Sequence, residues 1–255
     1  MDITGTTLSR DGYLLTDVSA PSAAGIPGTL SFTIRAADGT PVTGFAPSHG
    51  KALHLIVVRT DGVGYRHLHP ALDAATGIWS TPVAWDAAGS YRIFADATPL
   101  GADGITLSHT IDVAGDLRPV SARGERRHVS VDDLDVHLEG ALLTGDGGVL
   151  TVTVSEHGHP VQRLEPYLSA FGHLVALREG DLAYLHVHAL GDDPAPGSLS
   201  GPEIAFHASA PTPGRYFLYL DFQVDGRVRT ASFVVEASDA PSAPVEHHSH
   251  HVHAH

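Results

Sequence analysis

The same pattern of three histidines occurs twice in this chain, with the second copy 119 residues after the first. In each copy a histidine begins a short apolar segment that ends at arginine, and a Tyr-x-His-x-His segment begins six residues later. The histidines are His54, His67 and His69 in the first copy and His173, His186 and His188 in the second. Such a repeat indicates two similar domains, each with the same cluster of metal-type ligands.

A second pair of matching segments extends the repeat. Residues 88–96 and 213–221 share the pattern Gly-x-Tyr-x-x-x-x-Asp, with a shift of 125, so a few residues are inserted between the two motifs. We expect one domain at residues 6–114, a linker at 115–131 and a second domain at 132–236. The His-rich remainder, residues 237–255, has an Ala/Ser/Pro-rich start and is expected to be a disordered tail.

Short segments of alternating apolar and polar residues predict an all-β fold. Leu30, Phe32 and Ile34 alternate with polar neighbours, and turn residues such as Asp225-Gly226 separate the segments. Further strands are expected at residues 53–59, 64–69, 90–96, 104–112, 134–139, 149–155, 173–178, 183–188, 203–207, 215–222 and 227–235. We therefore predict two tandem immunoglobulin-like or cupredoxin-like β-sandwich domains.

The composition narrows the possible partners. Asp and Glu number 29 against 15 Lys and Arg, so nucleic acid is not an expected partner. The chain has no cysteine, which excludes disulfides and thiolate metal sites. No apolar run is long enough to span a bilayer, and the first residues lack the basic and apolar regions of an export signal. We expect no direct membrane insertion by this chain.

The first histidine cluster is expected on a β-hairpin. If Arg59 pairs with Gly64, His54 lies opposite His69, and His67 shares their face. Directly opposed Cβ atoms lie about 5 Å apart and diagonal ones about 7–8 Å apart. Three imidazoles in this arrangement can bind one metal ion.

The second repeat predicts an equivalent site. If Arg178 pairs with Ala183, His173 lies opposite His188, and His186 lies diagonally from His173. Each domain would then hold its own ion. A one-residue slip of either register would scatter the histidines between the two faces of the sheet.

A carboxylate is expected to complete each site. Asp96 and Asp221 end the equivalent downstream strand of their repeats and are the first candidates, whereas His49 and His207 have no clear repeat counterpart and are weaker ones. Imidazole with at most a carboxylate suits a divalent transition metal, namely Zn, Cu(II) or Ni.

Packing is an alternative role for these histidines. Ile56 and Val58 would share the histidine face of the hairpin, while Leu55 and Val57 occupy the other. Both faces are apolar, so the pattern does not show which one faces the core. Histidines bonded only to backbone carbonyls would belong to a structural or adhesive surface module.

Six histidines lie within the last nine residues, and they are interrupted by Ser, Val and Ala. They are His247, His248, His250, His251, His253 and His255. A flexible tail of this kind binds Zn, Ni or Cu weakly and with little geometric selectivity. We expect it to gather metal for the folded sites; a purification tag is the alternative.

A metalloenzyme is a second alternative. The Gly62, His67, His69 pattern and its copy resemble the first motif of cupins, and the length fits a bicupin. Cupins, however, have a Glu after the His pair and a further His on a later strand, and the later strands here end in Asp96 and Asp221.

The combined motifs, His-Leu-x-x-x-Arg, Tyr-x-His-x-His and Gly-x-Tyr-x-x-x-x-Asp, resemble a family of exported, metal-associated proteins of actinobacteria with YtkA-like and FixH-like immunoglobulin-type domains. The resemblance covers most of residues 6–236 and implies an extracytoplasmic location. Many relatives have His-Pro in both repeats; here Pro70 follows His69, but Ala189 follows His188. We expect this departure to leave the three ligands intact.

The function expected from these features is binding rather than catalysis. The two His clusters and the tail would hold a divalent transition metal for buffering, chaperoning or sensing in the cell envelope. The expected partners are the metal ions themselves and a membrane metal transporter.

Overall fold

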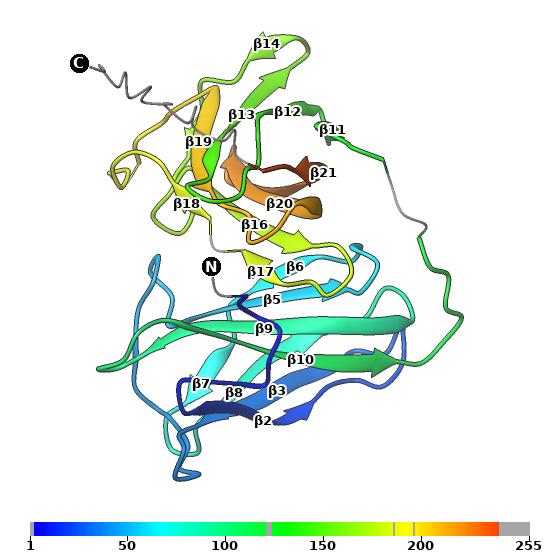
Figure 1. Cartoon of the computed structure of the whole chain (residues 1–255), viewed down its shortest axis with the longest axis vertical. Helices are drawn as coiled ribbons and strands as arrows, with labels where there is room; N and C mark the ends of the chain where they lie inside the picture. The colour runs from blue at the N-terminus through cyan, green and yellow to red at the C-terminus, as the bar shows by residue number, and fades with distance from the viewer. Residues whose placement is uncertain (1–2, 121–123, 186, 196, 240–255) are drawn as a thin grey trace, which may run out of the picture.

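The structure of the protein is a computed structural model that describes residues 3–120, 124–185, 187–195 and 197–239. All regular structure in these residues is β-strand, arranged in four antiparallel sheets (Figure 1), which confirms the predicted all-β class. No helix that could span a membrane occurs in this part of the chain.

The first repeat is a sandwich of two sheets. One sheet has the order β1-β2-β3-β8-β7, and the other has the order β10-β9-β5-β6, with β4 also paired to β9. Their bounds are β1 Ser9–Arg10, β2 Tyr13–Ser19, β3 Gly28–Arg35, β4 Phe45–Ala46, β5 Leu53–Arg59, β6 Arg66–Leu68, β7 Ala71–Asp73, β8 Ile78–Val83, β9 Gly89–Pro99 and β10 Ile105–Val113. Side chains from both sheets, including Phe32, Trp79 and Ile93, form one buried core.

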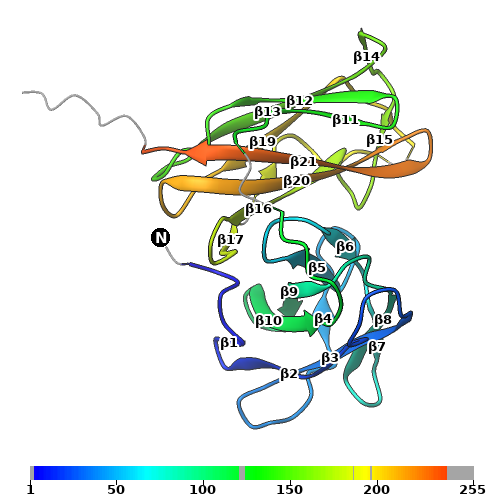
Figure 2. The same ribbon diagram turned by 90° about the vertical axis from the view of Figure 1, so that its right-hand side faces the viewer.

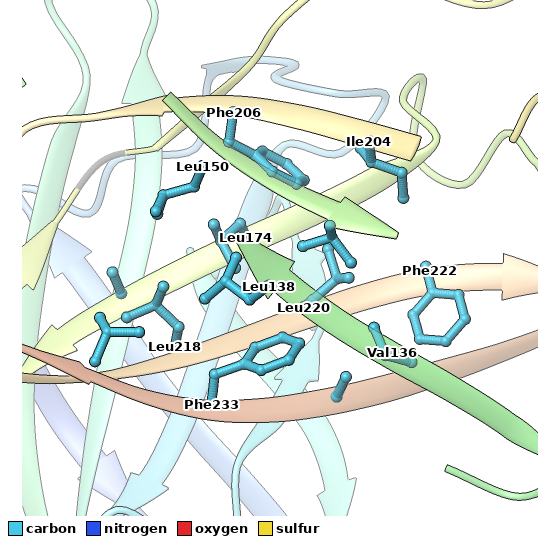
Figure 3. Close-up of a cluster of buried hydrophobic side chains, with 14 of the residues drawn as sticks. Val136, Leu138, Leu150, Leu174, Ile204, Phe206, Leu218, Leu220, Phe222 and Phe233 are labelled. Carbon is cyan, nitrogen blue, oxygen red and sulfur yellow. The ribbon is translucent and has the colours of Figure 1, made fainter. Parts of the chain in front are cut away.

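The second repeat has the same plan. One sheet has the order β11-β12-β13-β19-β18, with β14 on β13; the other has the order β15-β20-β16-β17, with β21 on β20. Their bounds are β11 His128–Val131, β12 Leu134–Gly140, β13 Gly148–Glu156, β14 His159–Pro160, β15 Leu164–Glu165, β16 Gly172–Arg178, β17 Tyr184–Leu185, β18 His188–Ala189, β19 Glu203–Ala208, β20 Gly214–Val224 and β21 Arg227–Ala237. Leucines and phenylalanines of the facing sheets fill its core (Figure 3).

The sequence pattern did not predict the short strands β1, β4, β7, β14 and β15, nor the longer strands β2, β8 and β11. A register shift between Thr16 and Ser19 interrupts the alternation of β2, and Pro82 lies within β8. Such irregularities weaken a period-two pattern. Strand β11 occupies the last four residues of the predicted linker and pairs with β12 as an edge strand.

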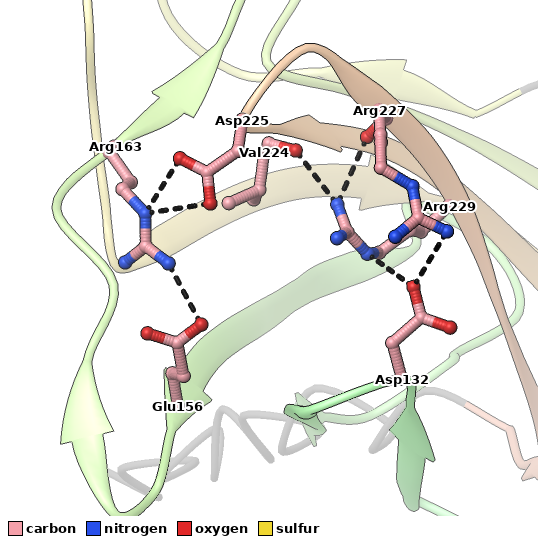
Figure 4. A network of polar contacts seen from close by, with 7 residues as sticks. All are labelled: Asp132, Glu156, Arg163, Val224, Asp225, Arg227 and Arg229. Atoms are coloured by element: carbon pink, nitrogen blue, oxygen red, sulfur yellow. Dashed lines mark hydrogen bonds and ion pairs between the residues drawn. The ribbon is translucent and has the colours of Figure 1, made fainter.

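The hairpin of β20 and β21 turns at Asp225-Gly226. Both residues have positive φ, 52° and 69°, as the two central positions of a type I′ turn require. Arg163, the residue before β15, bonds to Asp225 of this turn and to Glu156 of β13, so one guanidinium joins the turn to β13 (Figure 4). The Asp-Gly pair therefore forms the tight hairpin turn predicted for it.

The two repeats pack sheet against sheet. Strands β16 and β17 lie against β5 and β6 in both overall views (Figures 1 and 2). A third buried cluster joins the repeats: Ile56 and Val58 of β5 pack with Val175 and Leu177 of β16 and with side chains of β9, β17, β20 and β21. The two apolar faces of β5 are thereby explained, because one covers its own sandwich core and the other covers the second repeat.

The contribution of the contact between the repeats to the stability of the protein can be tested by substitution. Replacing Leu177 by Ala should lower the free energy of unfolding by about 2–5 kcal/mol, because it leaves a cavity between the repeats. Urea denaturation of the metal-free protein measures this, and Leu199→Ala is the control, since Leu199 is 60% exposed. Equal, small effects of the two substitutions would show that this contact contributes little.

Candidate metal centre

The first histidine hairpin has the predicted register. Ile56 pairs with His67 and Leu55 with Leu68, so the continuing register places His54 opposite His69. His54 is held from the other side by β9, where it pairs with Asp96. The three histidines consequently lie on one face of the hairpin, the face that meets the second repeat.

The ring nitrogens of these three histidines converge. His54 Nδ1 lies 2.9 Å from His67 Nε2 and 3.3 Å from His69 Nε2. One nitrogen of each ring lies within 4.8 Å of the other two. Nitrogens bound to one tetrahedral ion at about 2.0–2.1 Å would be about 3.3–3.4 Å apart, so the observed spacing is close to that of a metal site.

Hydrogen bonds set the tautomer of His54. Its Nε2 lies 2.9 Å from the carbonyl oxygen of Ser48, which only accepts, so Nε2 carries the hydrogen. In the neutral ring Nδ1 then has a lone pair directed at the cluster. Burial is the main reason that the pKa of His54 falls to about 4, with smaller contributions from neighbouring imidazoles. Burial likewise lowers the pKa of His69 to about 3.

A carboxylate of the second repeat sets the tautomer of His67. His67 Nδ1 donates to Asp221 Oδ2 at 2.9 Å, which leaves Nε2 facing His54. Asp221 is only 3% exposed and also accepts hydrogen bonds from Thr230 and Tyr65. With both rings neutral, two lone pairs face each other at 2.9 Å, an arrangement that a proton or a metal ion between them would relieve.

The contacts of Asp221 therefore differ from the predicted ones. It was expected as a ligand in the second repeat, but it orients a histidine of the first repeat. Its counterpart Asp96 accepts from Thr106 at 3.4 Å and from Tyr184, of the second repeat, at 3.4 Å. Burial, followed by the nearby carboxylate, raises the pKa of Tyr65 and of Tyr184 well above the usual value.

The second repeat does not assemble the predicted hairpin in full. Leu177 pairs with Tyr184 as expected, but His188 pairs with His207 of the opposite sheet rather than with His173. His186 lies outside the described residues, as do the six tail histidines.

The residue that follows the last histidine explains the difference. In the first repeat this residue is Pro70, which has no N–H for a strand ladder, and pairing with the opposite sheet begins only at Ala71. In the second repeat it is Ala189, and pairing begins at His188. The predicted pairing of His188 with His173 was therefore wrong, and the ligand role of His186 stays a prediction because it lies outside the described residues.

His173 instead joins the first cluster. Its ring centre lies 6.2 Å from that of His67 and 6.5 Å from that of His54, and His49 lies 5.1 Å from His173. His49, which the sequence ranked as a weaker candidate, is an exposed residue of the turn before β5. Together with Asp96 and Tyr184 these histidines line a pocket between the repeats. The described histidines of the two motifs thus lie around one shared pocket.

Comparison with known proteins identifies the family. The model of a domain of unknown function (DUF8832) matches residues 7–115 and again residues 129–239. The chain belongs to this family. Each DUF8832 match corresponds to one sandwich of the structure. The family description gives no activity, so the metal association implied by the resemblance stays a prediction.

No curated protein matches the chain, whereas solved structures show distant likenesses. InvD of Yersinia pseudotuberculosis is 13% identical, with a TM-score of 0.29 over 94% of this chain and 61% of that one. Domains 4–9 of surface layer protein SbsC are 12% identical, with a TM-score of 0.25 over 89% and 31%. The D00-D0 domain of Intimin is 9% identical, with a TM-score of 0.25 over 87% and 98%. The chain spans about a third to three fifths of the length of the first two, and no functional conclusion follows from these scores.

The hydrogen bonds of the histidine rings predict which ring nitrogen carries the hydrogen in each. Long-range ¹⁵N–¹H spectra of the metal-free protein should show His54 and His173 in the Nε2–H form, because each faces a backbone carbonyl, 2.9 and 2.8 Å away. His67 should retain a hydrogen on Nδ1. Exposed His159 serves as the reference, with both tautomers in exchange. An Nδ1–H form of His54 would contradict the assigned geometry.

Proposed function

We propose that this protein binds one divalent transition-metal ion through His54, His67 and His69 and that this binding is its function. The observation that carries the proposal is the pair of facing nitrogens, His54 Nδ1 and His67 Nε2, 2.9 Å apart. Each ring is held in that orientation by an acceptor on its far nitrogen. Metal-binding histidines are typically held in this way by a carbonyl or carboxylate behind the ring.

The chemistry of the donors favours an ion of borderline softness. Three imidazoles without thiolate suit Zn(II), Cu(II) or Ni(II), and the neutral form of His54 and His69 at pH 7 means that no proton has to leave these rings first. Buffering, chaperoning or sensing of such an ion in the cell envelope is the role we propose. Capture by the tail histidines and exchange with a membrane metal transporter are further parts of the proposal.

Metal titration tests the folded site. In a full-length variant whose six tail histidines are replaced by Ser, His67→Ala should weaken Zn(II) binding at least about 100-fold, because a ligand is lost at the centre of the cluster. Competition with a chromophoric chelator measures the Kd. His159→Ala, at an exposed site outside the cluster, is the control and should leave the Kd unchanged. Equal affinity in both variants would indicate that the histidines serve packing alone.

A second substitution tests the contribution of the other repeat. Asp221→Asn should weaken Zn(II) binding by about 10–100-fold, since an amide stabilises the ligating form of His67 less than a carboxylate does. The control is Asp86→Asn, because the Asp86 side chain is 85% exposed and pairs with Arg66. If the Kd of Asp221→Asn equals that of the control, Asp221 has no part in binding.

A further inference from the structure

We infer that His173 of the second repeat is the fourth ligand of this site, so that a single ion is bound by both repeats. The inference rests on the proposed function and specifies its coordination. His173 is the repeat counterpart of His54: it begins the apolar segment of β16, and it pairs with Asp221 as His54 pairs with Asp96.

The tautomer of His173 is the one that ligation needs. Its Nε2 donates to the carbonyl oxygen of Tyr167 at 2.8 Å, as His54 Nε2 donates to Ser48. In the neutral ring Nδ1 therefore carries a lone pair, and His173 lines the pocket beside His54 and His67. Tyr167 provides the only hydrogen bond of the His173 ring among the described residues.

The distances place His173 just outside the first three ligands. Rings bound to one tetrahedral ion have centres about 5 Å apart, given metal–nitrogen bonds of about 2.0–2.1 Å. The centres of His54, His67 and His69 are 4.8–5.1 Å apart. His173, at 6.2 and 6.5 Å, is about 1–1.5 Å farther away than a ligand would be. A rotation of its side chain with a small approach of the repeats would bring it into the coordination sphere.

Other groups near the cluster are weaker candidates for the fourth position. Asp221 already accepts from His67, Tyr65 and Thr230. His49 lies at a comparable distance, with its ring centre 6.1 Å from that of His54, but it is an exposed residue of the turn before β5, whereas His173 begins the β16 segment that is the counterpart of β5. Four imidazoles would close the coordination sphere, as in a site that stores an ion, whereas three would leave a position open to water or substrate.

X-ray absorption at the zinc edge tests the inference on the full chain with the six tail histidines replaced by Ser. The zinc-loaded protein should show four imidazole ligands. The His173→Gln variant should show three imidazole ligands, and its Kd for Zn(II) should rise at least tenfold. His49→Gln is the matched control and should retain four. Three imidazoles and a light oxygen ligand in the unsubstituted protein would overturn the inference, and this result does not depend on the folding of any site variant.

The two hypotheses fail in different ways. If His67→Ala abolishes binding while His173→Gln leaves the Kd and the imidazole count unchanged, the three-histidine site stands and His173 is not a ligand. Loss of the fourth imidazole in His49→Gln, with His173→Gln unaffected, would assign the position to His49 and overturn the inference. If neither His67→Ala nor His173→Gln changes the Kd, the proposed function itself is wrong.

Discussion

The packing of one repeat's sheet on the other is the constraint on which the rest of this structure depends. Ile56, Val58, Val175 and Leu177 have no place in either sandwich core and are buried only because the repeats meet. The same contact brings Asp221 to His67 and His173 to the pocket. The surroundings of the three first-repeat histidines therefore include residues of both repeats.

The contact is reciprocal, as expected for two copies of one fold that face each other. Tyr65 donates to Asp221, and its counterpart Tyr184 donates to Asp96; Tyr65 stacks on Tyr219 at 4.1 Å between ring centres, while Tyr184 packs on Phe94 at 5.5 Å. The symmetry breaks at the end of the hairpins. In the first repeat Pro70 follows His69, whose Nε2 lies 3.3 Å from His54 Nδ1, whereas in the second repeat His188 and Ala189 pair with the opposite sheet. Among the described residues, which do not include His186, one histidine cluster with contributions from both repeats forms.

The sequence predicts the fold well because alternation and turn residues are local signals. The register assumed for the first hairpin, with His54 opposite His69, agrees with the pairing in the structure. The docking of the repeats could not be predicted, because a strand that is apolar on both faces, such as residues 53–59, fits a buried core strand as well as a shared face. The role of Asp221 depends on that docking and was missed with it. His49 was only a weaker candidate ligand in the sequence analysis, because it lies in a turn and has no repeat counterpart.

The number of ions bound by each folded chain tests the central claim most directly. Native mass spectrometry of the full-length protein with its six tail histidines replaced by Ser, loaded with limiting and then excess Zn(II), measures it. A shared site predicts one tightly bound ion in each chain. Two ions bound with equal affinity would contradict it, because that is the result of an independent site in each repeat.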